Sequence, residues 1–409
     1  MSEPTAHPVD ESSPRYAGWR VVFACYLAAV FCWGFGLYGH GVYLTELNRL
    51  HGWPTSLIAA ATTVFYLVTA TMVVFISDAI ERLGPRLVML IGGLSFVVAV
   101  TVLASATTLW QLCAAYLIMA VGAASMHVGA ISNVVGRWFD RRRGLALSLA
   151  LNGASSGGIL ITPALVLAIA HYGFANAMIG SALLMILVLL PVVALWISAP
   201  AEPAATNASS RANPAAEAAA SAWTRGDALR SSAFWSVAAP FAMALTAQVG
   251  FLVHQIAMLE PALGRTAAGL SVATLTVAAI TGRFVLGACA IRLDMRRVTM
   301  WSVLSQAVGL GVLMVATEPA ALFFACALFG LSAGNLLTLP ALIIQREFET
   351  SAFGMLIGLS WAISQYTYAF GPGLLGILRD LTGGYGAPLA LCIALQIAAA
   401  AVILIRPAR

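Results

Sequence analysis

Apolar stretches long enough to cross a lipid bilayer recur along the whole chain, separated by short turns that carry arginine. A membrane-spanning helix needs about 20 mostly apolar residues. Only 9% of the 409 residues are charged, whereas about a quarter are charged in an ordinary soluble domain. The sequence therefore predicts an all-α membrane protein and excludes a water-soluble fold.

Hydropathy predicts twelve transmembrane helices in two groups of six. They are expected at residues 20–46, 55–77, 86–106, 109–135, 144–170, 174–197, 234–260, 267–289, 296–316, 319–345, 352–378 and 384–405. The segment between the two groups is rich in Ala, Pro, Ser and Asn, a composition typical of a flexible linker. The expected organisation is a tail at 1–18, a six-helix bundle at 19–198, a linker at 199–232 and a second six-helix bundle at 233–409.

The distribution of basic residues predicts the orientation in the membrane. The chain contains no lysine, so its 21 basic residues are all arginine. With a cytosolic N-terminus, 17 of them lie on the inner side, Arg49, Arg265 and Arg379 lie outside, and Arg283 lies within a span. Inner loops of membrane proteins carry the excess of basic residues, and the polar start of the chain does not resemble a signal peptide. Both termini and the linker are therefore expected in the cytosol, with the protein in a bacterial inner membrane.

An internal repeat supports two related halves. Two spans carry Gly, His and Glu at the same spacing, 214 positions apart: Gly36, His40 and Glu46 in the first span, and Gly250, His254 and Glu260 in the seventh. Convergent composition is the alternative. The repeat predicts that each half contributes a corresponding helix to one central path.

The turn at residues 77–86 reads Ser-Asp-Ala-Ile-Glu-Arg-Leu-Gly-Pro-Arg. It resembles the loop motif of the major facilitator transporters, with one residue extra. The resemblance implies two pseudo-symmetric six-helix bundles, and a conformational latch formed by Asp78, Arg82 and Arg86. A solvated charged turn is the alternative, and the corresponding turn of the second half, at residues 292–297, is degenerate.

Two further segments resemble the monocarboxylate transporters and the neighbouring oxalate–formate antiporters. Residues 138–146, Trp-Phe-Asp-Arg-Arg-Arg-Gly-Leu-Ala, are similar to the signature that precedes their fifth span. Residues 371–385, which begin Gly-Pro and end Asp-Leu-Thr-Gly-Gly-Tyr, are similar to the end of their eleventh span. These motifs cover a few dozen residues, so they indicate the fold more firmly than the substrate.

Arg283 is the leading candidate for a functional residue. An arginine at mid-depth of a span costs at least ~2.5 kcal/mol unless it faces water, a partner or a ligand. It matches the place in the eighth span where the resembled families keep a substrate-binding arginine, and a guanidinium can pair bidentately with a carboxylate. A structural ion pair is the alternative, although Ala279 stands where many monocarboxylate transporters have aspartate.

The resemblance also implies charge selectivity. Oxalate–formate antiporters pair this arginine with a lysine of the eleventh span, and alignment on Trp361 places Ser364 at that position. Some monocarboxylate transporters use a lysine in the first span, and this lysine has no counterpart here either, because the chain contains none. Arg283 is then the only fixed cation expected at mid-depth, and a monoanion is the expected substrate.

Three histidines, His40, His127 and His254, lie in the spans that line the central path of the family. Imidazole titrates near neutral pH, so each is a candidate for substrate binding or proton coupling. An interhelical hydrogen bond is the alternative for each. Glu46 and Glu260 end their spans near the outer face, where a wet rim or an outer gate is favoured over a proton carrier.

Other polar and aromatic side chains are candidates for the lining of the path, although membrane helices also use such groups in packing. They are Asn152, Gln248, Asn335, Trp361, Gln365 and Tyr366.

The sequence predicts secondary active transport of a small organic monoanion, a monocarboxylate, by proton symport through alternating access. An exporter of drugs or metabolites and an organic-anion exchanger are alternatives on the same fold. A membrane enzyme is a third, for which no nucleotide loop or nucleophile–base pair is found. The expected partners are the acid, protons and the lipid bilayer. No metal, cofactor or nucleic acid is expected, and the chain is expected to be a monomer.

Overall fold

The computed structural model describes residues 11, 13, 16–198, 223–289, 293–349 and 352–406, and these residues are nearly all helical. The N-terminal set of helices comprises α1 (Gly18–Trp33), the π-helical turn η1 (Gly34–Tyr38), α2 (Gly39–His51), α3 (Thr55–Leu83), α4 (Pro85–Ala104), α5 (Leu109–Ser125), α6 (Val128–Gly136), α7 (Arg143–Tyr172), α8 (Phe174–Leu184), the π-helical turn η2 (Met185–Leu189) and α9 (Leu190–Trp196). The C-terminal set comprises α12 (Arg225–Arg230), α13 (Ser232–Leu263), α14 (Arg265–Cys289), α15 (Met295–Val315), α16 (Pro319–Ala333), the 3₁₀ turn η4 (Asn335–Leu337), α17 (Leu339–Glu347), α18 (Phe353–Tyr368), α19 (Gly371–Thr382) and α20 (Gly386–Ile403).

Among the described residues, 11 helices are long and apolar enough to cross a membrane. They correspond to the expected spans one to ten and twelve. The eleventh, expected as a single helix at 352–378, consists of the two shorter helices α18 and α19. Helix α19 begins with Gly371 and Pro372, and proline lacks the N–H that would continue the helix before it. With this broken span counted, the twelve-span fold predicted from the sequence is confirmed.

Other spans are interrupted as well. The first passes from α1 to α2 through η1, whose sequence Gly-Phe-Gly-Leu-Tyr includes two glycines. The fourth is broken between α5 and α6, at Met126 and His127. Because π-helical turns recur at functional sites, these interruptions direct attention to the centre of the bundle.

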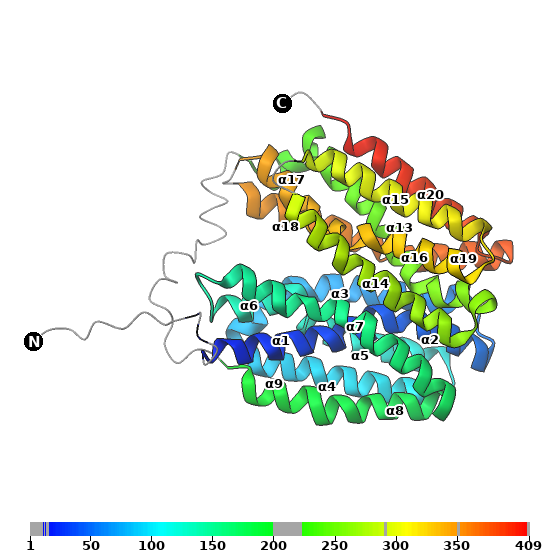
Figure 1. Cartoon of the computed structure of the whole chain (residues 1–409). Coiled ribbons are helices and arrows are strands. Elements are labelled where there is room, and N and C mark those ends of the chain that lie inside the picture. The colour runs from blue at the N-terminus through cyan, green and yellow to red at the C-terminus, as the bar shows by residue number, and fades with distance from the viewer. Residues whose placement is uncertain are drawn as a thin grey trace, which may run out of the picture.

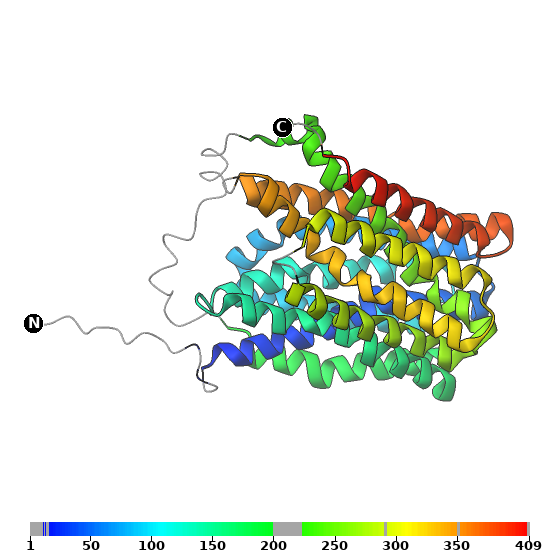
Figure 2. The ribbon, with the colours of Figure 1, turned by 45° about the horizontal axis from the view of Figure 1, so that its top comes forward.

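Helices pack side by side within each set, and some of these pairs are far apart in the chain (Figure 1). In the N-terminal set α1 packs against α7, and α4 packs against α5; in the C-terminal set α13 packs against α20, and α14 against α16. The sets meet mainly through α7 with α14, α2 with α13, and α3 with α19. Figure 2 shows the same bundle from a second direction, with its helices running along its length.

Polar groups join the two sets at the end of the bundle opposite the start of α1. Glu46, only 3% exposed, forms ion pairs with Arg265, at the start of α14, and with Arg49 at 2.8 Å. The backbone N–H of Ser56 donates to the carboxylate of Asp380 at 2.7 Å. These contacts hold the sets together at this end, whereas their ribbons diverge toward the end where α1 begins (Figure 1).

Part of the expected linker is folded. Residues 199–222 lie outside the described part of the chain, but 223–232 include α12. The hydroxyl of Thr224 accepts a hydrogen bond from the N–H of Asp227, whose carboxylate accepts one from the N–H of Thr224, which together form a capping box. Ala228 is buried, and the ring of Trp223 lies 5.6 Å from that of Phe348. This segment is therefore a capped helix packed on the C-terminal set rather than flexible chain.

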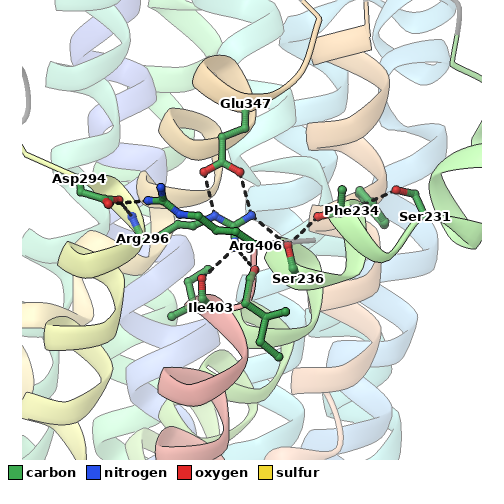
Figure 3. Close-up of polar contacts among 10 residues, drawn as sticks. Ser231, Phe234, Ser236, Asp294, Arg296, Glu347, Ile403 and Arg406 are labelled. Carbon is green, nitrogen blue, oxygen red and sulfur yellow. Dashed lines mark hydrogen bonds and ion pairs between the residues drawn. The ribbon is translucent and has the colours of Figure 1, made fainter. Parts of the chain in front are cut away.

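A buried arginine connects four helices at the end of the bundle where α20 finishes (Figure 3). Arg296, 2% exposed, donates two hydrogen bonds to the carboxylate of Glu347, each 2.8 Å long, and one to Ser236 at 2.9 Å. It also donates to the carbonyls of Ile403 and Ile405, both at 2.8 Å. These bonds use all five N–H donors of the guanidinium, so Arg296 is a structural residue.

Candidate functional site

A cavity of about 180 Å³ lies between the two sets of helices. Its lining comes from α1, η1, α3, α5, α6 and α7 on one side, and from α13, α14, α16, η4 and α18 on the other. Most of the lining side chains are apolar or aromatic. Arg283 is the one permanently charged side chain among the described residues of the lining.

Arg283 reaches the cavity from α14 and is half-buried. Its Nη2 donates a hydrogen bond to the hydroxyl of Ser155 on α7, and its Nε donates to the carbonyl of Ala279 at 3.4 Å. A Cβ at Gly334 would lie 2.8 Å from Nε, so the absence of a side chain there makes room for the guanidinium. In this environment α14 and α7 hold the arginine from opposite sides of the boundary between the sets.

The guanidinium retains donors for a ligand. Its two hydrogen bonds use two of its five N–H donors. Among the described residues, no Asp or Glu forms an ion pair with it. Arg283 thus differs from Arg296, whose donors are all used by protein groups.

His127 lies on another part of the cavity wall, directly before α6. Its ring is stacked on that of Trp33, with centroids 5.7 Å apart and planes at 26°. Its Nε2 lies 3.3 Å from Nε2 of Gln365 on α18. The break between α5 and α6 therefore brings a titratable side chain into contact with the other helix set.

Four of the predicted site residues line the cavity: Arg283, His127, Trp361 and Gln365. Gln248, a candidate for the lining of the path, also lies there. The structure places five others away from the cavity: His40, His254, Asn152, Asn335 and Tyr366. Of these, Asn335 is buried on η4, and Tyr366 is 41% exposed, with its hydroxyl 3.1 Å from that of Thr71. Fewer of the predicted residues therefore line the cavity than the sequence led us to expect.

His40 is buried behind the cavity wall in a cluster of rings. Its centroid lies 4.5 Å from that of Phe65, 4.8 Å from Tyr116, 5.7 Å from Tyr66 and 5.8 Å from Tyr43. Phe65 and Tyr66 line the cavity and separate His40 from it. His40 therefore does not line the cavity in this structure.

His254 takes part in hydrogen bonds that hold helices together. Its Nε2 lies 3.0 Å from the carbonyl oxygen of Pro372, and its Nδ1 lies 3.3 Å from the hydroxyl of Tyr385. These partners belong to the broken eleventh span and to the turn before α20. His254 therefore forms interhelical hydrogen bonds, which is the alternative that the sequence left open.

The two glutamates differ from each other. Glu46 is buried in the ion pairs with Arg49 and Arg265, a position at the contact between the sets rather than at a wet rim. Glu260 is only partly buried, near the end of α13. The two glutamates of the internal repeat therefore do not have equivalent environments.

The expected latch residues form no ion pair with one another in the described part of the chain. Asp78 and Arg82 are exposed at the end of α3, and Arg86 donates to the carbonyl of Ile197 at 2.7 Å. The buried ion pair at this end is instead the one between Arg296 and Glu347, in the half whose motif is degenerate. Its burial, which the sequence does not reveal, distinguishes Arg296 from its neighbours.

Several cavity residues were not predicted: Trp33, Tyr38, Ser155 and Tyr368. Ser155 lies in the run Gly-Ala-Ser-Ser-Gly-Gly at 153–158, a pattern typical of close helix packing. That packing is present, because a Cβ at Gly153 would lie 2.1 Å from the carbonyl oxygen of Tyr26 on α1. The signal that could reveal Trp33 and Tyr38 is their place in the first span, directly before the glycine-containing turn and at its last position.

The described residues contain no group of three or more His, Cys, Asp or Glu side chains that could hold a metal ion. The cysteines described are free, and Cys32, at the cavity, is buried. The polar and aromatic groups at the cavity are therefore one guanidinium, one imidazole, the thiol of Cys32, amides, hydroxyls and aromatic rings.

Comparisons with known proteins agree with this architecture. The chain is 24% identical over 359 residues to the MFS-type transporter YcxA of Bacillus subtilis, covering 83% of each protein. It is 26% identical to monocarboxylate transporter 11 of Mus musculus, covering 76% of this chain and 70% of that protein. It is 29% identical to the MFS-type transporter pynF of Aspergillus niger over 48% of this chain, and spans about half (46%) of that protein's length.

The fold matches that of a solved transporter. The crystal structure of the nucleoside transporter NupG superposes with a TM-score of 0.74 at 13% identity, covering 95% of this chain and 99% of that chain. The family profile described as Major Facilitator Superfamily matches residues 26–264, which is more than half of the chain. The protein is therefore a multi-pass membrane transporter that belongs to the Major Facilitator Superfamily.

Proposed function

We propose that this transporter moves a small organic monoanion, a monocarboxylate, together with a proton, by alternating exposure of the central cavity. The observation that carries the proposal is Arg283, a cavity arginine that has spare donors and no carboxylate partner among the described residues. A guanidinium that is half-buried between helices is destabilised when it has no counter-ion. A carboxylate in the cavity supplies that counter-ion and accepts the free donors in a bidentate pair.

The charge of the site supports a monoanion over a dianion. One guanidinium neutralises one carboxylate, and a second carboxylate would be desolvated without a partner. Such an uncompensated ion costs several kcal/mol. Ser364, at the position of the second cation in oxalate–formate antiporters, is buried and supplies no charge.

Proton coupling is assigned to His127, because it is the histidine that lines the cavity. A proton taken up there together with the anion keeps the cargo neutral overall, which lowers the cost of moving charge through a low-dielectric region. His40 lies one layer behind the wall, and His254 is engaged in interhelical hydrogen bonds. Exchange of one anion for another is the alternative that needs no titrating group.

An exporter of drugs or metabolites is the second candidate, and one observation favours it: the aromatic side chains of the lining. A lipophilic cation would bind such walls by cation–π contact. It would also face the charge of Arg283, and the described lining contains no Asp or Glu to offset it. The monoanion is therefore the better match.

Uptake into proteoliposomes tests the proposal. A monocarboxylate should accumulate when the proton gradient is directed inward, and a protonophore should abolish the accumulation. Uptake that ignores the gradient and requires only an internal counter-substrate would identify an exchanger. Binding of lipophilic cations but not of carboxylates would identify the exporter.

The orientation belongs to the same proposal: a bacterial inner membrane, with both termini in the cytosol. The end of the bundle where Glu46 meets Arg265 then faces the periplasm, and the end where α1 begins faces the cytosol. A cysteine introduced at Arg225, exposed on α12, tests this orientation. An impermeant thiol reagent applied to whole cells should leave it unlabelled, and labelling from outside would reverse the assignment.

A further inference from the structure

We propose that the transported monoanion is a single-ring aromatic carboxylate, of the benzoate or phenylacetate class. This inference rests on the proposed function, because it takes Arg283 as the partner of the carboxylate. It adds the identity of the rest of the substrate, which the size and the walls of the cavity determine.

The size of the cavity matches one ring and a carboxylate. Apolar cavities of about 150 Å³ hold one benzene molecule, and this cavity has a volume of about 180 Å³. A two-carbon or three-carbon acid would leave much of the apolar wall without contact.

The walls of the cavity are aromatic on both sides. Six ring-bearing residues besides His127 line it: Trp33, Tyr38, Phe65, Tyr66, Trp361 and Tyr368. The rings of Tyr66 and Tyr368, one from each set, meet edge to face with centroids 5.7 Å apart. A planar ring can extend this arrangement of stacked and edge-to-face contacts, which favours it beyond the area that it buries.

The charge and the walls together select an acid with an aromatic body. Arg283 disfavours cations, and the described lining offers no carboxylate to bind them. Trp361 lies on α18, lines the same cavity as Arg283 and is partly buried, so part of its indole remains available for contact. The carboxylate is assigned to Arg283 and the ring to the aromatic walls.

Isothermal titration of the purified full-length protein with three probes tests the assignment. Benzoate should bind about tenfold more tightly than cyclohexanecarboxylate, which has the same charge and similar size but no aromatic faces. Benzamide, which has the ring without the charge, should bind at least tenfold more weakly than benzoate. Equal affinity for benzoate and cyclohexanecarboxylate would overturn the aromatic assignment alone. Benzamide binding as tightly as benzoate would overturn the role of Arg283, and the proposed function with it.

Substitutions of lining residues test whether the aromatic walls cause the preference for benzoate. Trp361→Leu should reduce the preference for benzoate over cyclohexanecarboxylate, while affinity for cyclohexanecarboxylate stays unchanged and thereby reports an intact site. Trp301→Leu, on α15 and 67% exposed, is the matched control and should bind both acids as the wild type does. Trp33→Leu provides a second test, on the other helix set. Retention of the tenfold selectivity in both cavity variants contradicts the assignment.

Discussion

Nε2 of Gln365 on α18 lies 3.3 Å from Nε2 of His127, so a polar contact joins the two helix sets at the wall of the cavity. With the amide nitrogen facing the ring, Gln365 donates and the imidazole must be neutral to accept. A protonated His127 requires the amide to turn, so that its oxygen accepts instead. The contact therefore has different partners in the two protonation states of His127.

The first prediction is that His127→Gln uncouples transport from protons. Glutamine can hydrogen bond to Gln365 but does not titrate, so exchange of labelled for unlabelled acid across proteoliposomes should continue. Accumulation driven by an inward proton gradient should fall to the equilibrium level. His171→Gln, exposed on α7, is the control and should accumulate as the wild type does. Normal accumulation by His127→Gln would exclude His127 as the coupling residue.

The second prediction concerns Arg283. Arg283→Lys keeps the charge but loses the bidentate fork, so monocarboxylate affinity should fall at least tenfold, which corresponds to ~1.4 kcal/mol. Expression and thermal stability should be unchanged, because the fold does not depend on an ion pair at this residue. Isothermal titration of the purified variant measures the effect, and wild-type affinity in the lysine variant contradicts the account of the site.

In the wild type, succinate should bind at least tenfold more weakly than butyrate, which has the same number of carbon atoms and one carboxylate fewer. The reason is that the second carboxylate finds no cation in the cavity. Competition by the dianion at equal concentration would show that another positive group serves the site.

The third prediction is structural. Glu347→Gln should destabilise the C-terminal set by about 3 kcal/mol, since it leaves the charge of Arg296 buried without a counter-ion. Arg297→Met, at the next position, is the matched control: its side chain is 78% exposed and its nearest carboxylate contact, to Asp294, is 3.9 Å long. A melting curve of the purified protein should show a clear fall in Tm for Glu347→Gln and none for Arg297→Met. Equal Tm values would mean that Arg296 is not held by this pair.

The sequence predicts the spans well because membrane helices must satisfy their backbone hydrogen bonds internally and present apolar side chains to lipid. It also indicates Arg283, because a charge at mid-depth is conspicuous in an apolar chain. It does not separate the three histidines, whose roles depend on small differences in helix facing. His127 lies at the break between α5 and α6 and lines the cavity, whereas His40 packs behind the rings of Phe65 and Tyr66.

The expected latch is a second case in which the sequence identifies polar residues but not their environments. Its motif predicts charged groups at a helix end, and these are present, but the motif does not reveal which groups are buried. Arg82 is exposed, whereas Arg296, from the degenerate copy, has all five donors engaged. That difference depends on carbonyls at the end of α20, more than 100 positions away in the chain.

The last prediction concerns the end of the bundle where Glu46 meets Arg265. Glu46 is almost fully buried and pairs with Arg265 of the other helix set, so opening this end must separate the two charges. Glu46→Gln removes the ionic part of this contact but keeps the shape of the side chain, and should shift the population toward the state that is open at this end. A loss of ~1.4 kcal/mol changes the ratio of the two states tenfold. Spin labels on either side of the contact, one on α2 and one on α14, should report a larger fraction of long distances in the variant.

Glu260→Gln, at the repeat-related position, has no ion pair among the described residues and is the matched control. An unchanged distance distribution in Glu46→Gln, or an equal change in both variants, would show that the pair does not govern the opening.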